Sequence, residues 1–198
     1  MLPLTVSLVQ GATRWHDAPA NRDYYGELVR RARGSDLVVL PETFLSGFSN
    51  DTRASADTMD GEGIAWLRAL AAEVGAVICG SVAIREDEVV YNRLLWMRPD
   101  GSFERYDKRH LFRMAGEHTR YGSGSRRPIV ELKGWRILPQ VCYDLRFPVW
   151  LRNRRLAPRA AWTTTSRSSW RTGRLHGASR GAPCCARVRS RTSPAWSG

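Results

Sequence analysis

The sequence predicts an α/β protein, in which a sheet is packed against helices. Apolar runs at 4–10 and 36–42 read as strands, and an amphipathic stretch at 21–33 lies between them. A second helical stretch at 63–73 precedes a third buried strand at 76–84. Strands that alternate with helices are typical of a sheet covered by helices. A hydrophobic content of 42% in 198 residues is enough for the core of one globular domain.

Glycines and loop residues bound the N-terminal elements. The first strand, 4–10, ends at Gly11, and the residues at 17–21 are typical of a helix start. The stretch 21–33 has apolar residues at helical spacing among charged ones, and Gly34 ends it. We therefore expect a surface helix between the first two strands.

The second half of the chain reads as two hairpins separated by a long loop. Strands at 89–97 and 103–106 flank a Pro-Asp-Gly turn, and strands at 129–132 and 135–141 flank a Lys-Gly turn. Residues 107–128 are polar and without clear period. Because loops of this length inside compact domains are often functional, we expect functional residues there.

Cys142 directly follows the last predicted strand, at a point where a helix can begin. On such a turn the backbone N–H groups and the helix dipole favour the thiolate, which attacks carbonyl carbon. The strand-to-helix nucleophile turn of serine hydrolases has the same geometry. An isolated cysteine is more often a buried core residue, so residues elsewhere in the chain must decide between the two.

The four cysteines form neither a disulfide framework nor a metal-ligand spacing. No apolar run approaches the roughly 20 residues of a membrane helix, and the N-terminus lacks the basic region of a signal peptide. We therefore expect a cytoplasmic protein with reduced thiols and no membrane partner.

Three chemically complementary side chains come at or just beyond strand ends: Glu42, Lys108 and Cys142. Strand ends gather at the edge of a layered sheet, so these residues can converge there. A carboxylate can accept the thiol proton, and an ammonium can stabilise an oxyanion. Individually, Glu42 and Lys108 are also compatible with solvated surface charges. Together the three favour a nucleophilic role for Cys142.

Three motifs resemble those of the nitrilase superfamily of carbon–nitrogen hydrolases, and the resemblance runs from Leu4 to Arg154. The motifs are Leu40-Pro41-Glu42-Thr43-Phe44, Tyr106-Asp107-Lys108-Arg109-His110-Leu111-Phe112 and Val141-Cys142-Tyr143-Asp144-Leu145-Arg146-Phe147-Pro148. Their order along the chain is that of the family. The resemblance implies a four-layer αββα sandwich that is usually oligomeric and contains no metal or cofactor.

The resemblance also implies roles for individual residues. Glu42 corresponds to the general base, Lys108 to the oxyanion lysine and Cys142 to the nucleophile. Glu117 corresponds to the family's second glutamate, which positions the substrate and the lysine. The backbone N–H of Tyr143 would be a second donor to the oxyanion.

Within the family, residues 108–115 and 142–150 are most similar to the ω-amidases. This implies a small-molecule amide substrate, the terminal amide of 2-oxo acids such as 2-oxoglutaramate and 2-oxosuccinamate, cleaved to acid and ammonia through a cysteine thioester. Arg113 and Arg146 are candidates to bind a substrate carboxylate, and internal salt bridges are an equal alternative. A deaminated-glutathione or other short-chain amidase is the alternative within the family.

Residues 155–198 differ sharply from the rest of the chain. They contain nine Arg and no Asp, Glu or Lys, whereas residues 1–154 contain 22 basic and 19 acidic side chains, so most of the net charge of +12 belongs to the tail. The tail also lacks Ile, Phe, Tyr and Met. We expect a carbon–nitrogen hydrolase domain at 1–154, incomplete at its C-terminal side, and a disordered or irregular tail at 155–198.

A shifted reading frame explains the composition of this tail. The family pattern Ala-Asn-Trp-Pro, with its codons read one base late, gives the Arg-Thr-Gly-Arg found at 171–174. A later family pattern read in the same frame gives the run at 184–192. We therefore interpret the tail as an out-of-frame translation, in which Cys184 and Cys185 have no metal or redox role.

Two other classes of function remain open. The tail is also compatible with an Arg/Ser-rich nucleic-acid-binding extension in which Trp162, Trp170 and Trp196 stack on bases. If the tail is an out-of-frame translation, we expect the protein to have no nucleic-acid partner. Alternatively, the chain is an inactive truncated pseudoenzyme or binding scaffold. Because missing strands would expose apolar faces, we expect the 198-residue chain to release little or no ammonia and to aggregate.

Overall fold

A computed structural model describes residues 2–152, 166–167 and 184–188 of the chain. In chain order the elements are β1 (Leu4–Leu8), α1 (Ala18–Arg31), β2 (Leu37–Val39), α2 (Thr52–Ser55), α3 (Glu62–Val74), β3 (Val77–Glu86), β4 (Val89–Met97), β5 (Phe103–Asp107), η1 (Arg113–Ala115), η2 (Glu117–Thr119), β6 (Val130–Leu132), β7 (Trp135–Leu138), η3 (Cys142–Arg146), α4 (Pro148–Leu151), β8 (Ser166–Arg167) and β9 (Cys184–Val188). The α/β class and the strands of both predicted hairpins are confirmed.

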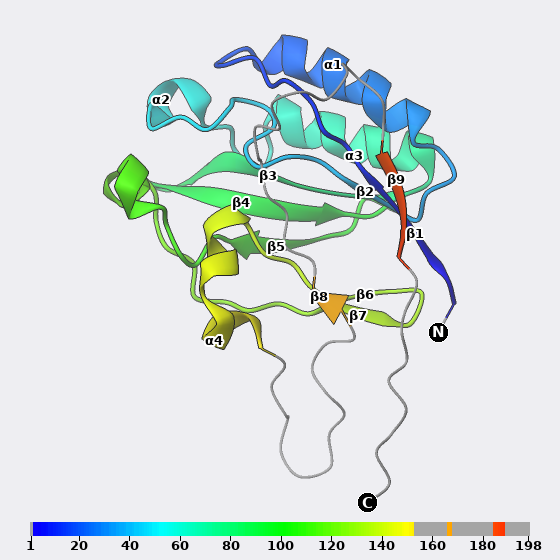
Figure 1. Ribbon diagram of the computed structural model, residues 1–198. Helices are drawn as coiled ribbons and strands as arrows, with labels where there is room; N and C mark the ends of the chain where they lie inside the picture. The colour runs from blue at the N-terminus through cyan, green and yellow to red at the C-terminus, as the bar shows by residue number, and fades with distance from the viewer. Residues whose placement is uncertain (1, 153–165, 168–183, 189–198) are drawn as a thin grey trace, which may run out of the picture.

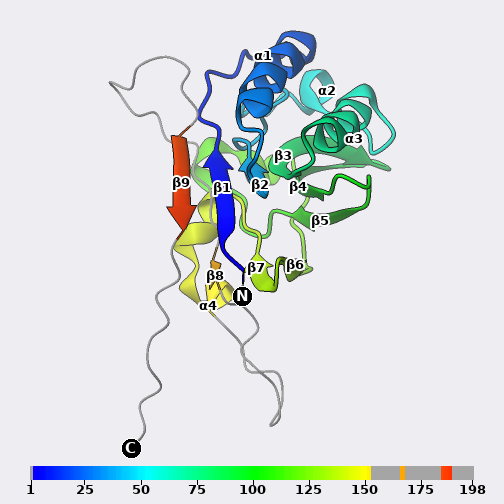
Figure 2. The ribbon, with the colours of Figure 1, turned by 90° about the vertical axis from the view of Figure 1, so that its right-hand side faces the viewer.

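The large sheet has the strand order β5-β4-β3-β2-β1-β9 (Figures 1 and 2). Its central pairs, β1 with β2 and β2 with β3, are parallel, and β3, β4 and β5 pair antiparallel. Helices α1 and α3 make the two crossovers that the parallel pairs need. Because β1, β2 and β3 run in one direction, the loops after their carboxyl ends lie at one edge of the sheet.

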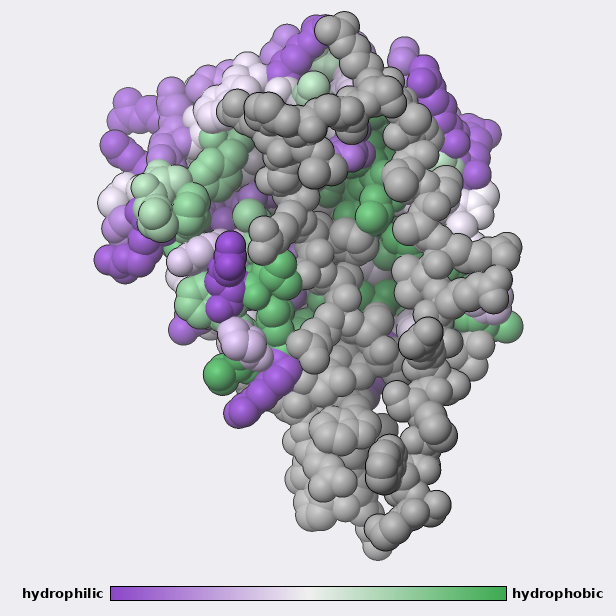
Figure 3. Space-filling view, viewed as in Figure 1, coloured by the Kyte–Doolittle hydropathy of each residue, from purple (hydrophilic) through white to green (hydrophobic). Residues whose placement is uncertain are grey.

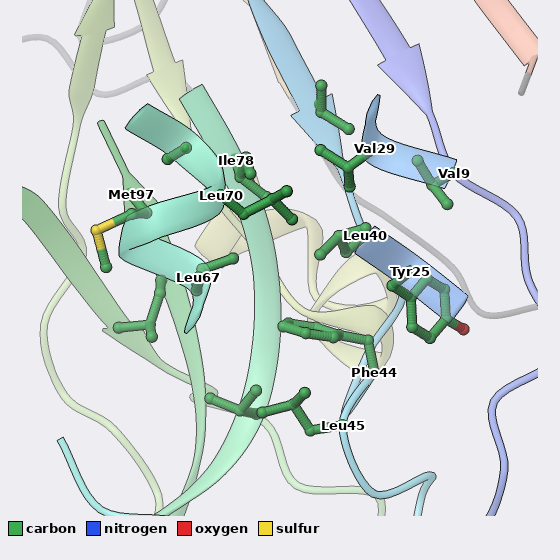
Figure 4. Close-up of a cluster of buried hydrophobic side chains, with 14 of the residues drawn as sticks. Val9, Tyr25, Val29, Leu40, Phe44, Leu45, Leu67, Leu70, Ile78 and Met97 are labelled. Atoms are coloured by element: carbon green, nitrogen blue, oxygen red, sulfur yellow. The ribbon is translucent and has the colours of Figure 1, made fainter. Parts of the chain in front are cut away.

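Helices α1 and α3 cover one face of this sheet, and a hydrophobic core lies beneath them (Figure 4). Tyr25 and Val29 of α1 meet Leu67 of α3, Leu40 and Phe44, and all five are almost fully buried. Burial of apolar surface on this scale is the main stabilising contribution to such a layer. The core thus fixes the segment that follows β2 against the helices.

Local sequence determines where the helices begin and end. Asp17 caps α1 by accepting a hydrogen bond from the Ala20 N–H at 3.0 Å, so the helix starts earlier than the expected residue 21. Gly75, with φ of 67°, ends α3 in the left-handed conformation. The ion pair between Arg30 and Glu73 joins the outer surfaces of the two helices at 2.8 Å. Figure 3 shows hydrophilic side chains along this upper rim of the molecule.

The hairpin of β6 and β7 covers the opposite face of the sheet, below it in Figure 1. Trp96 of β4 and Tyr106 of β5 are fully buried there with Trp135 and Ile137 of β7 and with Val141. The described residues therefore form three layers, with helices on one face of the large sheet and a second, smaller sheet on the other. This second core supports the turn at Cys142, which directly follows Val141.

Two short strands fall in the tail that the sequence predicts to be disordered or irregular. β8 pairs in parallel with β7, and β9 pairs antiparallel with β1. The rest of the 155–198 prediction, including Trp162, Trp170 and Trp196, lies outside the described residues. Across the part of the chain that the structure describes, no helix is both long and apolar enough to cross a membrane.

Candidate active site

Glu42 lies just beyond the end of β2, where the chain turns into the interior. Pro41 has no N–H to continue the strand, and Thr43 adopts a left-handed φ of 47°. The Thr43 N–H donates to the Ser81 hydroxyl at 3.0 Å, which holds this unusual turn. As a result the Glu42 side chain points inward and is only 4% exposed.

Lys108 lies just beyond the end of β5, and the pairing of β5 with β4 positions it. Its neighbour Asp107 is opposite Arg93 in the ladder, and the two side chains form a bidentate ion pair at 2.6 and 3.0 Å. The Lys108 N–H donates to the Asn92 carbonyl at 2.9 Å. The Lys108 ammonium is fully buried, and its Nζ lies 2.8 Å from Oε1 of Glu42.

Glu117 binds the other side of the same ammonium. Both of its oxygens contact Lys108 Nζ, Oε2 at 2.8 Å and Oε1 at 3.0 Å. The Phe112 N–H donates to Oε2 at 2.6 Å, which fixes the carboxylate from the backbone. Gly116, with φ of 72°, makes the turn that directs Glu117 inward. The structure thus brings Glu42 and Lys108 together and places Glu117 beside the same ammonium, while the catalytic roles that the resemblance implies for them stay predictions.

Burial and charge act in opposite directions on Lys108. Burial lowers its pKa, but the nearby carboxylates of Glu42 and Glu117 raise it by more, so the pKa lies above its ordinary value and the group stays an ammonium. An ammonium has three N–H donors. In this structure Nζ donates to three carboxylate oxygens, Oε1 of Glu42 and both oxygens of Glu117.

Cys142 is the first residue of η3 and has a left-handed φ of 40°, which is uncommon for a residue with a side chain. Burial and then the negative charge of Glu42 raise the pKa of its thiol from 9.0 to about 12, although Lys108 acts in the opposite direction. The expectation that local N–H groups make Cys142 a thiolate is therefore wrong. Because η3 is a five-residue 3₁₀ helix, its dipole is too small to offset burial beside a carboxylate.

This correction defines what Glu42 must do. A neutral thiol is a weak nucleophile, so its proton has to leave as the new bond forms. The Glu42 carboxylate is close enough to the thiol to raise its pKa through charge and a hydrogen bond. Its Oε1 already accepts from Lys108 and Asn92, whereas Oε2 carries neither of these bonds. The arrangement can perform nucleophilic attack with a carboxylate as base.

The remaining predicted residues surround this cluster less tightly. The Tyr143 ring packs against Phe112 and Phe147, with ring centroids 5.0 and 5.3 Å away. Arg113 in η1 and Arg146 at the end of η3 are exposed. Among the described residues neither arginine has an ion pair, so the structure does not provide the internal salt bridges considered as their alternative role.

Sequence reasoning missed Asn92 and gave no role to Asp144. Asn92 is buried, and its Nδ2 donates to Glu42 Oε1 at 2.8 Å and to Glu117 Oε1 at 3.1 Å. The available signal was a polar residue within the apolar strand β4. Asp144 is fully buried and accepts from the Tyr106 hydroxyl at 2.7 Å. Its signal was its place in the motif that contains Cys142.

The described residues contain no group of three or more His, Cys, Asp or Glu side chains arranged to hold a metal ion. The site is therefore built from a thiol, two carboxylates and an ammonium, on an α/β scaffold. These features define an α/β protein in which a cysteine thiol lies beside a buried cluster of two carboxylates and an ammonium. A model of the carbon-nitrogen hydrolase family matches residues 5–175, and the chain belongs to that family.

Two relatives and one solved structure show which members of the family the chain resembles. The chain is 46% identical to the omega-amidase YafV of Yersinia enterocolitica over 176 residues, covering 87% of this chain and 68% of that protein. It is 32% identical to the 2-oxoglutaramate amidase of Bacillus subtilis over 126 residues, covering 62% and 49%. XC1258 of Xanthomonas campestris, a CN-hydrolase superfamily protein with an arsenic adduct in its active site, has a TM-score of 0.82 and 55% identity, covering 85% and 64%.

These coverages show that the chain is shorter than the proteins it resembles. It spans about two thirds of the Yersinia and Xanthomonas proteins and about half of the Bacillus protein. The family match also continues beyond residue 154, where the predicted domain ends.

Proposed function

We propose that this protein is an amidohydrolase of the ω-amidase type. It hydrolyses the terminal amide of small 2-oxo dicarboxylic acid monoamides, such as 2-oxoglutaramate and 2-oxosuccinamate, and releases ammonia. The observation that carries the proposal is the buried Glu42–Lys108–Glu117 cluster beside the thiol of Cys142. Similarity to an omega-amidase and to a 2-oxoglutaramate amidase supports the substrate class.

In the first stage, Sγ of Cys142 attacks the amide carbon while Glu42 takes the thiol proton. The carbonyl oxygen becomes an oxyanion, which the Lys108 ammonium stabilises by its charge and which accepts a hydrogen bond from the Tyr143 N–H. Tyr143 lies in the first turn of η3, where backbone N–H groups have no partner within the helix. Glu42 then protonates the leaving nitrogen, the C–N bond breaks, and ammonia departs from a Cys142 thioester.

In the second stage, water enters the position that ammonia leaves. Glu42 takes a proton from this water, whose oxygen attacks the thioester carbon. The oxyanion is stabilised by the same groups as before. The C–S bond then breaks, the sulfur recovers its proton from Glu42, and the carboxylic acid is released. Glu117 keeps the Lys108 ammonium in place throughout through two contacts, at 2.8 and 3.0 Å.

Substrate selection falls to residues around the mouth of the site. A dicarboxylic acid monoamide carries a free carboxylate, and Arg113 and Arg146 are exposed cations in the two segments that follow Lys108 and Cys142. Arginine binds a carboxylate through two parallel hydrogen bonds. An amidase for deaminated glutathione or other short-chain amides would use the same catalytic cluster, with a different set of mouth residues.

We further propose that the complete enzyme is an oligomeric four-layer αββα sandwich and that residues 155–198 arise from a shifted reading frame. The described helices and two sheets correspond to three of the four layers and so support the sandwich. Ammonia release from 2-oxosuccinamate tests the function, both for the 198-residue chain and for a chain with its frame restored from codon 155. Activity in the restored chain that is absent from its Cys142→Ala variant supports the proposal, and equal activity in the two excludes it.

A further inference from the structure

Asp144 is a fully buried carboxylate two residues after Cys142, and it contacts neither Glu42 nor Lys108 directly. Its Oδ2 accepts from the Tyr106 hydroxyl at 2.7 Å and from the Val141 N–H at 3.2 Å. Its Oδ1 accepts from the His110 N–H at 2.9 Å and lies 2.8 Å from Nδ1 of the same histidine. A buried carboxylate is tolerated only with such complete hydrogen bonding.

These partners belong to the two segments that carry the proposed chemistry. Tyr106 and His110 lie on either side of Lys108 in the sequence, and Val141 immediately precedes Cys142. Among the described residues, no main-chain hydrogen bond joins the segment 106–112 to the segment 141–147. Side-chain contacts connect the two segments, and the Asp144 carboxylate accepts the hydrogen bonds from both of them.

Aromatic contacts complete the link around this carboxylate. The His110 ring stacks on Phe147 with centroids 3.6 Å apart and planes within 8°. The Tyr106 oxygen also accepts from Trp150 Nε1 at 3.3 Å. Burial and the charge of Asp144 raise the pKa of Tyr106, so its hydroxyl keeps its proton and remains a donor. The hydrogen bond from Tyr106 to Asp144 therefore has a fixed direction.

The backbone at Cys142 gives this link its importance. A left-handed φ at a residue other than glycine is strained and persists only where surrounding contacts hold it. Asp144 binds the N–H of Val141, the residue before the strained position, and connects it to both flanks of Lys108. A nucleophile displaced by about 1 Å from its productive position can lose about 100-fold in rate.

We infer that Asp144 is a positioning residue, whose carboxylate fixes the Cys142 thiol relative to the Lys108 ammonium. This inference rests on the proposed function for the roles of those two groups. It requires that Asp144 act through Val141, Tyr106 and His110, without touching the substrate.

The test compares two reagents that alkylate Cys142 in the purified 198-residue chain. Acrylamide addition moves charge onto a carbonyl oxygen, which the Lys108 ammonium stabilises, whereas iodoacetamide displaces iodide without that need. The ratio of the two rates therefore reports alignment of thiol and ammonium, and cancels changes in exposure. Peptide mass spectrometry separates Cys142 from Cys79, which is fully buried and serves as the internal reference.

Asp144→Asn keeps the size of the side chain but turns one acceptor into a donor that faces existing donors. We expect the acrylamide-to-iodoacetamide ratio to fall about tenfold or more. Tyr106→Phe removes one donor and should lower the ratio by a smaller factor. The matched control is Asp23→Asn, the same chemical change at an exposed position of α1, which should leave the ratio unchanged.

An unchanged ratio in a folded Asp144→Asn chain overturns the inference. Where circular dichroism shows that this variant is unfolded, Tyr106→Phe decides: a lowered ratio supports the inference and a wild-type ratio overturns it. The readout needs no turnover. If the frame-restored chain releases no ammonia from 2-oxosuccinamate while the ratio change is still observed, the proposed function is contradicted and the positioning role is retained.

Discussion

The ammonium of Lys108 is expected to be essential for the stability of this chain, in addition to its proposed chemistry. Its Nζ lies 2.8 Å from one oxygen of each of Glu42 and Glu117, and all three side chains are at most 4% exposed. Lys108→Met retains most of the aliphatic stem and removes the charge. Two buried carboxylates then face each other with only the Asn92 amide between them.

The size of the effect follows from this burial. Removing one partner of a buried ion pair costs about 3–5 kcal/mol, because the remaining charge is left uncompensated. Urea unfolding at pH 7, followed by tryptophan fluorescence, measures this loss as a change in the free energy of unfolding.

Lys133→Met is the matched control, since Lys133 forms an ion pair with Asp36 whose side chains are 40% and 18% exposed. An exposed pair of this kind contributes about 0.2–1 kcal/mol. If the Lys108→Met chain loses no more stability than the Lys133→Met chain, the claim that Lys108 neutralises two buried carboxylates is refuted.

Three further outcomes are expected. Stability should fall as the pH rises from about 9 toward 12, because the folded chain holds the protons of Cys142 and Tyr106 more tightly than the unfolded chain does. Urea unfolding midpoints at pH 8 and pH 10.5 measure this fall. A Cys142→Ala chain should lose less stability over the same pH range. Replacing Arg113 or Arg146 by Ala in a frame-restored chain should raise the KM for 2-oxosuccinamate about tenfold or more while leaving a neutral short-chain amide unaffected, and equal effects on both amides would exclude carboxylate binding. Resequencing of the coding DNA should reveal a one-base shift near codon 155, and an intact frame there would refute the origin proposed for the tail.

Much of the fold could be predicted because local patterns and tertiary structure agree in it. β4 was predicted at its observed bounds, 89–97, because turn residues on both sides of this apolar run mark where the strand begins and ends. The start of α1 was misplaced because its cap, Asp17, lies before the region of apolar periodicity. The long segment 107–128 contains η1 and η2, whose short 3₁₀ turns have no periodic signal in the sequence.

The site was predicted from motifs, whereas its supporting contacts could not be. Glu42 and Lys108 lie together because the carboxyl ends of β2 and β5 meet at the same edge of the sheet, whereas only the resemblance pointed to Glu117. The protonation of Cys142 was wrong, since burial and a carboxylate 100 residues away in sequence are invisible to local reasoning. Asn92 was missed for the same reason, because its two acceptors lie in other elements.

The identity of the nucleophile is tested most directly by ammonia release from 2-oxosuccinamate, measured on the frame-restored chain and on its Cys142→Ala variant. The proposed mechanism predicts steady release by the first and none by the second, because the variant lacks the Sγ atom that attacks the amide carbon. Release by the Cys142→Ala variant at the parent rate would contradict it.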